Sequence, residues 1–209
     1  MSGELSVTAQ ELLGDHGAVV IDCRFSLADP GEGETRYLQA HIPGAHYLHL
    51  NRDLSGPVGE HGGRHPLPDA DQLAARLASC GIGPDTEVIA YDDSRLAFAA
   101  RLWWLMRSLG YRPPRLLEGG YQAFLSAGGE ADNGIPPSSP RPVPEGLAFT
   151  GYCDIDGLRT RQEAGALLVD SREEKRYAGL EEPIDPVAGH IPGAVNRPWQ
   201  GVTTEAGQL

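Results

Sequence analysis

The residues best suited to chemistry occur in two copies along the chain. One apolar run ends in Asp-Cys-Arg at residues 22–24, and another ends in Asp-Ser-Arg at residues 170–172, 148 positions later (170 − 22). Each is followed by the pentapeptide His-Ile-Pro-Gly-Ala, which begins at His41 and again at His190, 149 positions later (190 − 41). Because the two spacings agree to one residue, the sequence predicts an internally duplicated domain.

The chemistry that these residues favour is the binding of a small anion. Asp22 and Arg24 follow the apolar run 18–21, and the carboxyl ends of parallel strands are where open α/β sheets place their ligands. Both copies also carry an Arg-Tyr pair, at 36–37 and at 176–177. One arginine with a few backbone N–H groups can bind an anion locally, even in an acidic protein.

The composition argues against several classes of partner. The chain has 209 residues with 17 basic and 29 acidic side chains, so its net charge is −12 (17 − 29). This charge disfavours binding to a nucleic-acid backbone. No run of about 18 apolar residues predicts a membrane helix, and residues 1–8 lack the basic start and apolar run of a signal peptide. We therefore expect a cytoplasmic protein with neither a nucleic acid nor a membrane as partner.

The cysteines and histidines predict neither a disulfide nor a metal site. Cys23, Cys80 and Cys153 are odd in number and widely spaced, so we expect them to be reduced. Cys23 follows a strand, but no helix begins after it to stabilise a thiolate, which favours a small buried residue. Three histidines gather near the first pentapeptide, at positions 41, 46 and 49, without an acidic or thiol partner to complete a ligand set. We expect no metal and no cofactor.

The apolar pattern alternates between short strands and helices. It predicts strands at 18–21, 47–50, 87–91 and 116–117, helices at 7–13, 69–79, 95–109 and 121–125, a loop at 27–35, and a short helix that begins at Tyr37. Thr8 followed by Glu11 has the spacing of a capping box. The alternation implies an α/β domain with a mostly parallel sheet flanked by helices.

Proline marks the division of the chain into domains. Residues 128–149 contain five prolines and no apolar periodicity, which is typical of an extended linker. We expect a first domain at 1–127, this linker at 128–149, and the beginning of a second domain of the same kind at 150–209, with a helix at 155–163.

These motifs together resemble a known family. The second copy reads Gly-His-Ile-Pro-Gly-Ala-Val-Asn at 189–196, and the first copy adds Arg-Leu-Trp-Trp at 101–104 and Leu-Glu-Gly-Gly-Tyr at 117–121. In this order, with the Asp-x-Arg and Arg-Tyr motifs and the Pro-rich linker, the chain resembles the rhodanese superfamily, specifically the tandem thiosulfate and 3-mercaptopyruvate sulfurtransferases. The likeness covers nearly the whole chain.

The resemblance implies a sulfur relay through one cysteine of the second domain. A small anionic sulfur donor gives its outer sulfur to a thiolate, and the resulting persulfide passes it to cyanide or a thiol. Arg176 matches the arginine that binds the substrate anion in this family, and Asp170 matches its partner at the strand end. The resemblance gives Asp22, Arg24, His41, Arg172 and His190 supporting roles in the structure.

The catalytic cysteine is expected beyond Leu209. In such folds its loop follows the strand that corresponds to residues 87–91, where the first copy has Asp92-Asp93-Ser94 and no thiol. The repeat offset puts the second copy's loop near position 241 (92 + 149). We therefore expect a truncated second domain in this chain, and an active enzyme only in a longer form.

Several alternatives stay open at this point. Residues 181–186 contain no cation for the carboxylate of mercaptopyruvate, which favours thiosulfate as donor. A catalytically inactive rhodanese-homology module for binding or regulation is the second hypothesis. A phosphatase with a related cysteine loop is the third, and its single-domain architecture fits a tandem poorly.

Overall fold

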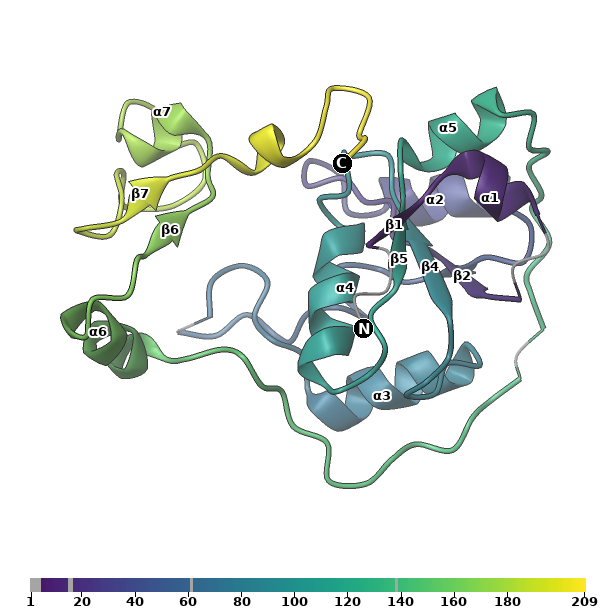
Figure 1. Ribbon diagram of the computed structural model, residues 1–209, viewed down its shortest axis with the longest axis horizontal. Helices are drawn as coiled ribbons and strands as arrows, with labels where there is room; N and C mark the ends of the chain where they lie inside the picture. Colours follow the sequence, from purple (N-terminus) through teal and green to yellow (C-terminus); the bar gives the residue numbers. More distant parts are fainter. Residues whose placement is uncertain (1–4, 15–16, 61, 138) are drawn as a thin grey trace. The chain divides into compact units, whose positions relative to one another are not determined.

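The structure, a computed structural model, describes residues 5–14, 17–60, 62–137 and 139–209 (Figure 1). The chain forms two compact units, one up to Thr150 and one from Gly151 onwards. None of the helices in the described ranges is long and apolar enough to cross a membrane.

A five-stranded parallel sheet forms the centre of the first unit. Its strands are β1 (Ser6–Val7), β2 (Val19–Asp22), β3 (His46–Tyr47), β4 (Val88–Tyr91) and β5 (Arg115–Leu117). They lie in the order β1-β5-β4-β2-β3, and every neighbouring pair is parallel (Figure 1). The central strand β4 is buried along its whole length, as expected for a parallel strand covered on both faces.

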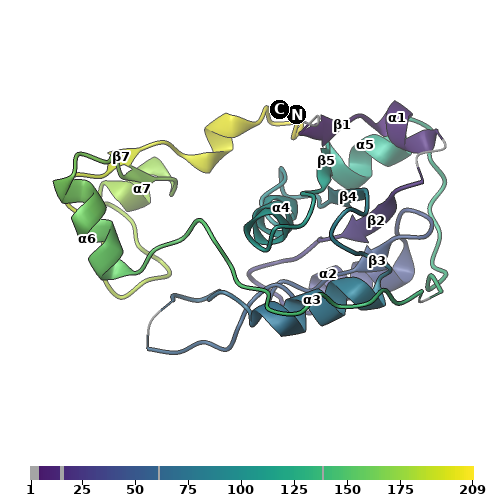
Figure 2. The ribbon, with the colours of Figure 1, turned by 60° about the horizontal axis from the view of Figure 1, so that its bottom comes forward.

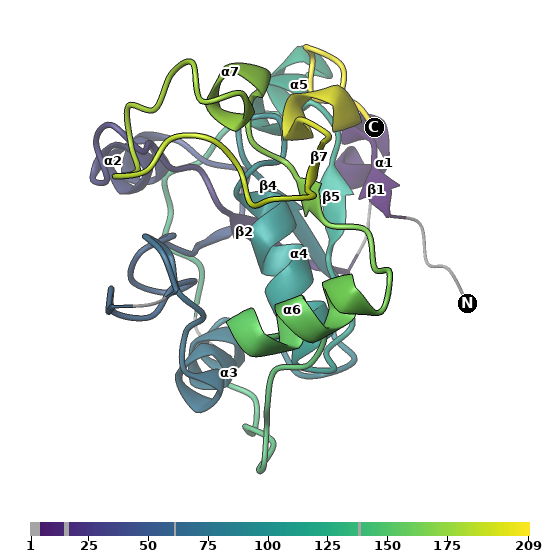
Figure 3. The ribbon, with the colours of Figure 1, turned by 90° about the vertical axis from the view of Figure 1, so that its left-hand side faces the viewer.

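Five helices cover the two faces of this sheet. They are α1 (Ala9–Leu13), α2 (Glu32–Gln39), α3 (Ala70–Ser79), α4 (Ala99–Ser108) and α5 (Gly120–Ser126). Helices α3 and α4 lie on one side of the sheet and α1 and α5 on the other (Figure 2). Leucines of α3 and α4 form one core cluster with β2 and β4, and residues of α1 and α5 belong to a second cluster. Helix α4 lies against β4 and β5 (Figure 3). The predicted α/β class with a mostly parallel sheet and flanking helices is confirmed.

The predicted helix boundaries are correct at some ends and wrong at others. Helix α1 has the predicted capping box between Thr8 and Glu11. Helix α4 begins at Ala99 rather than at Arg95, because Arg95 and Leu96 adopt positive φ angles of 58° and 68°, which a helix excludes. The predicted loop at 27–35 is wrong from Glu32 onwards, where α2 begins.

The Pro-rich segment runs along the first unit in extended conformation. Asp132 forms an antiparallel bridge with His41 through two backbone hydrogen bonds of 2.7 and 2.9 Å. Further along, the backbone N–H of Arg141 donates to the Ala78 carbonyl at 3.0 Å, and Leu147 packs against the core. The segment predicted as a linker is thus attached to the first unit by backbone pairing and by apolar packing.

The second unit contains a strand pair that corresponds to β2 and β3 of the first unit. It contains α6 (Ile155–Glu163), β6 (Val169–Asp170), α7 (Glu174–Tyr177), β7 (Val195–Asn196) and a 3-10 helix at Trp199–Val202. Strand β6 pairs in parallel with β7 so that Asp170 faces Asn196, as Asp22 faces Tyr47 between β2 and β3. The other edge of β2 pairs with β4 over four residues. Among the described residues, β6 has no such second partner.

A close backbone contact in the first unit gives a stability prediction for Gly120. Gly120 has a φ angle of +56°, and a Cβ there would lie 1.9 Å from the carbonyl oxygen of Asp92. We expect Gly120→Ala to lower the free energy of unfolding by more than about 2 kcal/mol, through the left-handed backbone and the clash together. Urea unfolding measures this change.

The matched control is Gly128→Ala. Gly128 also has a positive φ, of +91°, but a Cβ there would meet nothing within 4 Å. The control should lose only the conformational part, about 1–2 kcal/mol. Equal losses for the two variants would contradict the close approach at Asp92.

Candidate anion-binding site

A buried ion pair organises the end of β2. Asp22 is fully buried and Arg24 is 2% exposed. Arg24 donates from Nε to both carboxylate oxygens at 3.1 and 2.9 Å and from Nη2 to Oδ2 at 2.7 Å. The same Nη2 donates to the Ala40 carbonyl at 2.7 Å. The pair therefore joins the strand end to the start of the first His-Ile-Pro-Gly-Ala segment.

Two tyrosines complete the surroundings of this pair. Tyr91, at the end of β4, donates its hydroxyl to Asp22 Oδ2 at 2.7 Å and accepts the backbone N–H of Ile42 at 3.3 Å. The guanidinium of Arg24 lies 4.2 Å from the ring centroid of Tyr121 in α5, within the range of a cation–π contact. These contacts help to offset the desolvation penalty of burying the ion pair.

The histidine of each pentapeptide stacks on the tyrosine of the Arg-Tyr pair. His41 stacks on Tyr37 with centroids 4.0 Å apart, and His190 stacks on Tyr177 at 3.8 Å. In each unit the histidine Nδ1 contacts the tyrosine carbonyl oxygen, at 2.7 and 2.8 Å. Each tyrosine hydroxyl donates at 2.8 Å to the alanine carbonyl of its own pentapeptide. The histidines thus support the loop in the structure.

The second unit contains the same ion pair in a more exposed setting. Arg172 donates from Nε to both oxygens of Asp170 at 3.1 Å and from Nη2 to Oδ2 at 2.6 Å. Its Nη2 also donates to the Gly189 carbonyl at 2.6 Å, which corresponds to the Ala40 contact of Arg24. These hydrogen bonds from Arg172 lower the pKa of Asp170.

Arg176 is held by two carboxylates of the loop that follows α7. Its Nε and Nη2 donate to both oxygens of Glu182 at 2.9 to 3.2 Å, and Nη2 lies 2.6 Å from Asp185 Oδ2. The Arg176 side chain is 14% exposed. The pKa of Glu182 is lowered, first by the backbone N–H of Asp185 and then by Arg176.

A cavity of about 660 Å³ in the second unit lies beside this cluster. Its lining includes Asp170, Arg172, Asp185 and His190, together with the apolar residues Val169 and Ile191. Three of the predicted site residues therefore meet at one cavity. Arg176 reaches it through its partner Asp185 and is not itself part of the lining. Asp22, Arg24 and His41 form the corresponding cluster of the first unit.

The loop after β4 in the first unit is built around a carboxylate. Asp92 is 1% exposed, and it accepts the backbone N–H groups of four residues of the loop and the start of α4: Ser94, Leu96, Phe98 and Ala99, at 2.8 to 3.0 Å. Burial raises the pKa of Asp92, while these four donors work in the opposite direction. The next residue, Asp93, forms an ion pair with Arg36. Two carboxyl side chains, Asp92 and Asp93, therefore lie in the loop that corresponds to the expected cysteine loop of the second copy.

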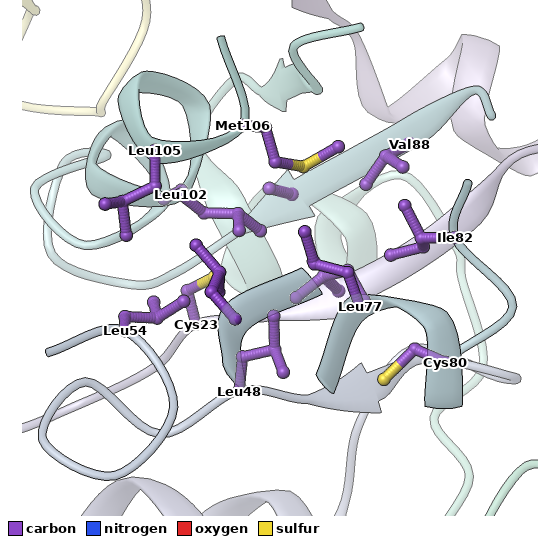
Figure 4. Packing of buried hydrophobic residues seen from close by; sticks show 14 of the residues in the cluster. Cys23, Leu48, Leu54, Leu77, Cys80, Ile82, Val88, Leu102, Leu105 and Met106 are labelled. Atoms are coloured by element: carbon purple, nitrogen blue, oxygen red, sulfur yellow. The ribbon is translucent and has the colours of Figure 1, made fainter. Parts of the chain in front are cut away.

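The cysteines of the first unit are unsuited to nucleophilic attack. Cys23 and Cys80 are 1% and 2% exposed and lie in the core cluster (Figure 4). Burial raises the pKa of both thiols, and for Cys23 the charge of Asp92 raises it further. Cys153 is exposed, and all three cysteines are free. The prediction that Cys23 is a small buried residue is confirmed.

In the described part of the chain, no group of three or more His, Cys, Asp or Glu could hold a metal ion.

Comparison with known proteins identifies the family. Residues 7–127 match the family described as "Rhodanese-like domain". The chain is 46% identical to the "Probable 3-mercaptopyruvate sulfurtransferase" of Pseudomonas aeruginosa, in an alignment that covers 93% of this chain and 70% of that protein. The chain belongs to the rhodanese family. The resemblance inferred from the motifs is confirmed.

Two further relatives agree with this assignment. The "Putative thiosulfate sulfurtransferase SseB" of Mycobacterium tuberculosis is 39% identical over 98% of the chain, which spans 74% of it. The structure of "3-mercaptopyruvate sulfurtransferase from Leishmania major" superposes with a TM-score of 0.83 at 30% identity. That comparison covers 96% of this rhodanese chain and 56% of the Leishmania chain, so the chain spans just over half of that protein.

Sequence reasoning identified the charged pairs but not everything that contacts them. It missed Tyr91 and Tyr121, which come from strands and helices far along the chain. It also missed Glu182, for which the sequence offers no signal beyond an acidic loop. Tyr37 and Tyr177 belong to the repeated Arg-Tyr pairs, but their stacking on His41 and His190 was not predicted.

The buried pair of the first unit gives a stability prediction. Asp22→Ala leaves the Arg24 charge buried without its carboxylate, so we expect a loss of about 3–5 kcal/mol in the free energy of unfolding. The control is Glu87→Ala, which removes the solvent-exposed pair with Arg112 and should cost less than about 1 kcal/mol. Denaturant unfolding compares the two variants, and a similar loss in both would refute the structural importance of the buried pair.

The ion pair of the second unit gives a pH prediction. The pKa of Asp170 is lowered in the folded state, so its contribution to stability is complete above about pH 4 and is lost as the pH falls through the lowered value. The backbone N–H of Arg172 donates to the Asp170 carboxylate and that of Arg197 donates to the Asp170 carbonyl. Protection of both groups against hydrogen exchange, measured relative to the rate of an unfolded chain at the same pH, should therefore fall below about pH 4. Asp170→Asn should remove this acid-dependent step, and an unchanged acid response in that variant would contradict the assignment.

Proposed function

We propose that the protein is a sulfurtransferase that moves the outer sulfur of a small anionic donor to a thiol or to cyanide through a cysteine persulfide. The supporting observation is that Arg176 follows a second copy of the Asp-x-Arg frame, in a chain 46% identical to a relative named as a sulfurtransferase. In this proposal Arg176 binds the donor anion, and Asp170 with Arg172 holds the strand end that positions it.

The first unit supports this role for the arginine of the Arg-Tyr pair. Arg36, the counterpart of Arg176, reaches the loop after β4 and pairs there with the carboxylate of Asp93. An arginine at this position therefore contacts an anion at the loop where the family carries its cysteine. By the repeat, Arg176 would face the corresponding loop of a complete second domain.

We place the catalytic cysteine on a longer form of this protein. Cys23 and Cys80 are buried. The edge of β6 that is unpaired among the described residues corresponds to the edge of β2 that β4 occupies. A strand added there would bring its carboxyl end to Asp170, as β4 brings Tyr91 to Asp22. This tandem arrangement, with domains at 1–127 and from 150 onwards, is part of the proposal.

The reaction itself needs little from the protein beyond charge and geometry. The thiolate attacks the outer sulfur of thiosulfate, the sulfur–sulfur bond breaks, and sulfite leaves with the electron pair. Cyanide or a thiolate then attacks the outer sulfur of the persulfide and regenerates the cysteine thiolate. Arg176 can stabilise the charge on the donor and on the departing sulfite.

Thiosulfate is the preferred donor in this proposal. The loop 181–186 contains no cation for a second anionic group. The named relatives include both mercaptopyruvate and thiosulfate enzymes. Comparing kcat/KM for the two donors decides between them.

A cytoplasmic location is also proposed, which the three free cysteines support.

Arg176→Ala tests the proposal in the full-length gene product. Loss of a charge-assisted anion contact costs about 1.5–3 kcal/mol, so kcat/KM for thiosulfate should fall more than about tenfold in a thiocyanate-formation assay. The control is Arg159→Ala, which removes an exposed arginine of α6 paired with Asp156 and should leave kcat/KM within about twofold. Unchanged kinetics for Arg176→Ala would remove it from the site.

The 209-residue chain by itself should form no thiocyanate from thiosulfate and cyanide. Turnover by this chain would contradict the assignment of the nucleophile to a longer form. Absence of turnover in the full-length gene product as well would favour the second hypothesis, a rhodanese-homology module that binds without catalysis.

A further inference from the structure

The histidine of the first pentapeptide contacts two backbone carbonyl groups with its ring. His41 is fully buried. Its Nδ1 lies 2.7 Å from the carbonyl oxygen of Tyr37, and its Nε2 lies 3.1 Å from that of Gly134. A carbonyl oxygen only accepts, so each bond needs a proton on the ring nitrogen, and a neutral imidazole carries only one such proton. Both bonds therefore exist together only when the His41 ring is positively charged.

A second histidine of the first unit has the opposite pattern of partners. Nδ1 of His49 accepts the backbone N–H groups of Asn51 and Arg52 at 3.1 and 3.2 Å, and its Nε2 lies 3.0 Å from the Pro30 carbonyl oxygen. One accepting and one donating nitrogen are what a neutral imidazole provides. His49 is thus an internal reference for His41.

The repeat shows which of the two His41 contacts belongs to the pentapeptide frame. In the second copy, Nδ1 of His190 makes the same contact with the carbonyl oxygen of Tyr177, at 2.8 Å. The Nε2 contact of His41 instead reaches Gly134, 93 residues later in the chain. It is therefore an addition to the frame that attaches the Pro-rich segment to the first unit.

The attached part of the segment has two further contacts with the first unit. Asp132 forms the antiparallel backbone bridge with His41. Beyond Gly134, Ile135 and Pro136 form part of the wall of a cavity of about 390 Å³, which Tyr37 also lines. The Nε2 bond thus lies between the bridge and this wall.

The charges around the ring favour its positive form. Titratable groups reach its surroundings from α2, from the Pro-rich segment and from the ends of β2 and β4: Tyr37, Asp132, Asp22, Arg24 and Tyr91. Asp22 and Arg24 compensate each other, and burial raises the pKa of both tyrosines, which keeps their hydroxyls neutral. The pKa of Asp132 is lowered, first by the backbone N–H of Gly134 and also by His41. Its carboxylate is therefore charged and attracts a positive ring.

We propose that His41 is a protonation-dependent latch for residues 132–136 of the Pro-rich segment. With a proton on each nitrogen, the ring donates to Tyr37 and to Gly134 and holds the segment. Transfer of the Nε2 proton to water leaves a lone pair that faces the Gly134 carbonyl oxygen, so this bond is lost while the Nδ1 bond remains. A rise in pH thus loosens the segment that leads to the second unit.

An NMR titration of the 209-residue chain follows both sides of the latch. The ring ¹⁵N shifts of His41, assigned by their loss in His41→Gln, report the proton on each nitrogen, and the carbonyl ¹³C shift of Gly134 reports its hydrogen bond. We expect both nitrogens to be protonated on the acid side, and the Nε2 proton and the Gly134 bond to be lost at one midpoint. His49 should titrate without changing the Gly134 shift.

Hydrogen exchange measures the loosening itself. The backbone N–H of Asp132 donates to the His41 carbonyl. Its protection, relative to the rate of an unfolded chain at the same pH, should fall at least about threefold as the pH rises through the His41 midpoint.

The charge of Asp132 gives a test by substitution. Asp132→Asn keeps an oxygen that can accept the backbone N–H groups of Asn133 and Gly134 and removes the negative charge. We expect the midpoints of His41 and Gly134 to move together to lower pH, by about 0.2–0.7 pH units. The matched control is Glu130→Gln, which removes one negative charge from the same segment and should move both midpoints by less than half as much.

Two results would overturn the latch. If His41 carries a single ring proton at every pH at which the chain is folded, the ring is neutral and holds Gly134 in no proton-dependent way. If the ring loses its Nε2 proton while the Gly134 shift stays constant, the proton does not control the segment. Both results leave the proposed function of Arg176 untouched.

Discussion

The ion pair between an aspartate at a strand end and the arginine two residues later is the constraint on which the rest of the structure depends. In the first unit, Asp22 and Arg24 are almost completely removed from water, which costs a desolvation penalty that good geometry and further partners must offset. Those partners come from β4, from α5 and from the segment before the first pentapeptide. The pair thereby fixes the positions of elements that are distant in sequence.

Comparing the two copies shows which contacts recur and which segments vary. The Asp-Arg pair and the stacked Tyr-His pair recur with nearly the same distances, whereas the connections between them differ. From the tyrosine to the histidine the chain takes 4 residues in the first copy (41 − 37) and 13 in the second (190 − 177). The longer connection brings Glu182 and Asp185 to Arg176, so an insertion outside the frame changes the electrostatics of the candidate site.

The sequence predicted the fold class and the charged pairs because local and repeated patterns encode them. Strand β4 follows from an apolar run, and α6 has the predicted bounds, with Asp154 capping it in the structure. The start of α4 could not be predicted, since it depends on Asp92 accepting four N–H groups in a turn that places Arg95 and Leu96 at positive φ. The ion pairs of Arg176 could not be predicted either, because Glu182 becomes buried only when the loop folds back onto α7.

The most direct test of the account is to locate the sulfur itself. The full-length gene product is treated with thiosulfate, separated from excess donor without reducing agent, and digested for peptide mass analysis. We expect one sulfur atom to be added to a single cysteine that follows Leu209 in the full-length chain, and Arg176→Ala to reduce this addition greatly. Addition to Cys23, Cys80 or Cys153, or no addition at all, would contradict the proposal of a persulfide relay on the second copy of the frame.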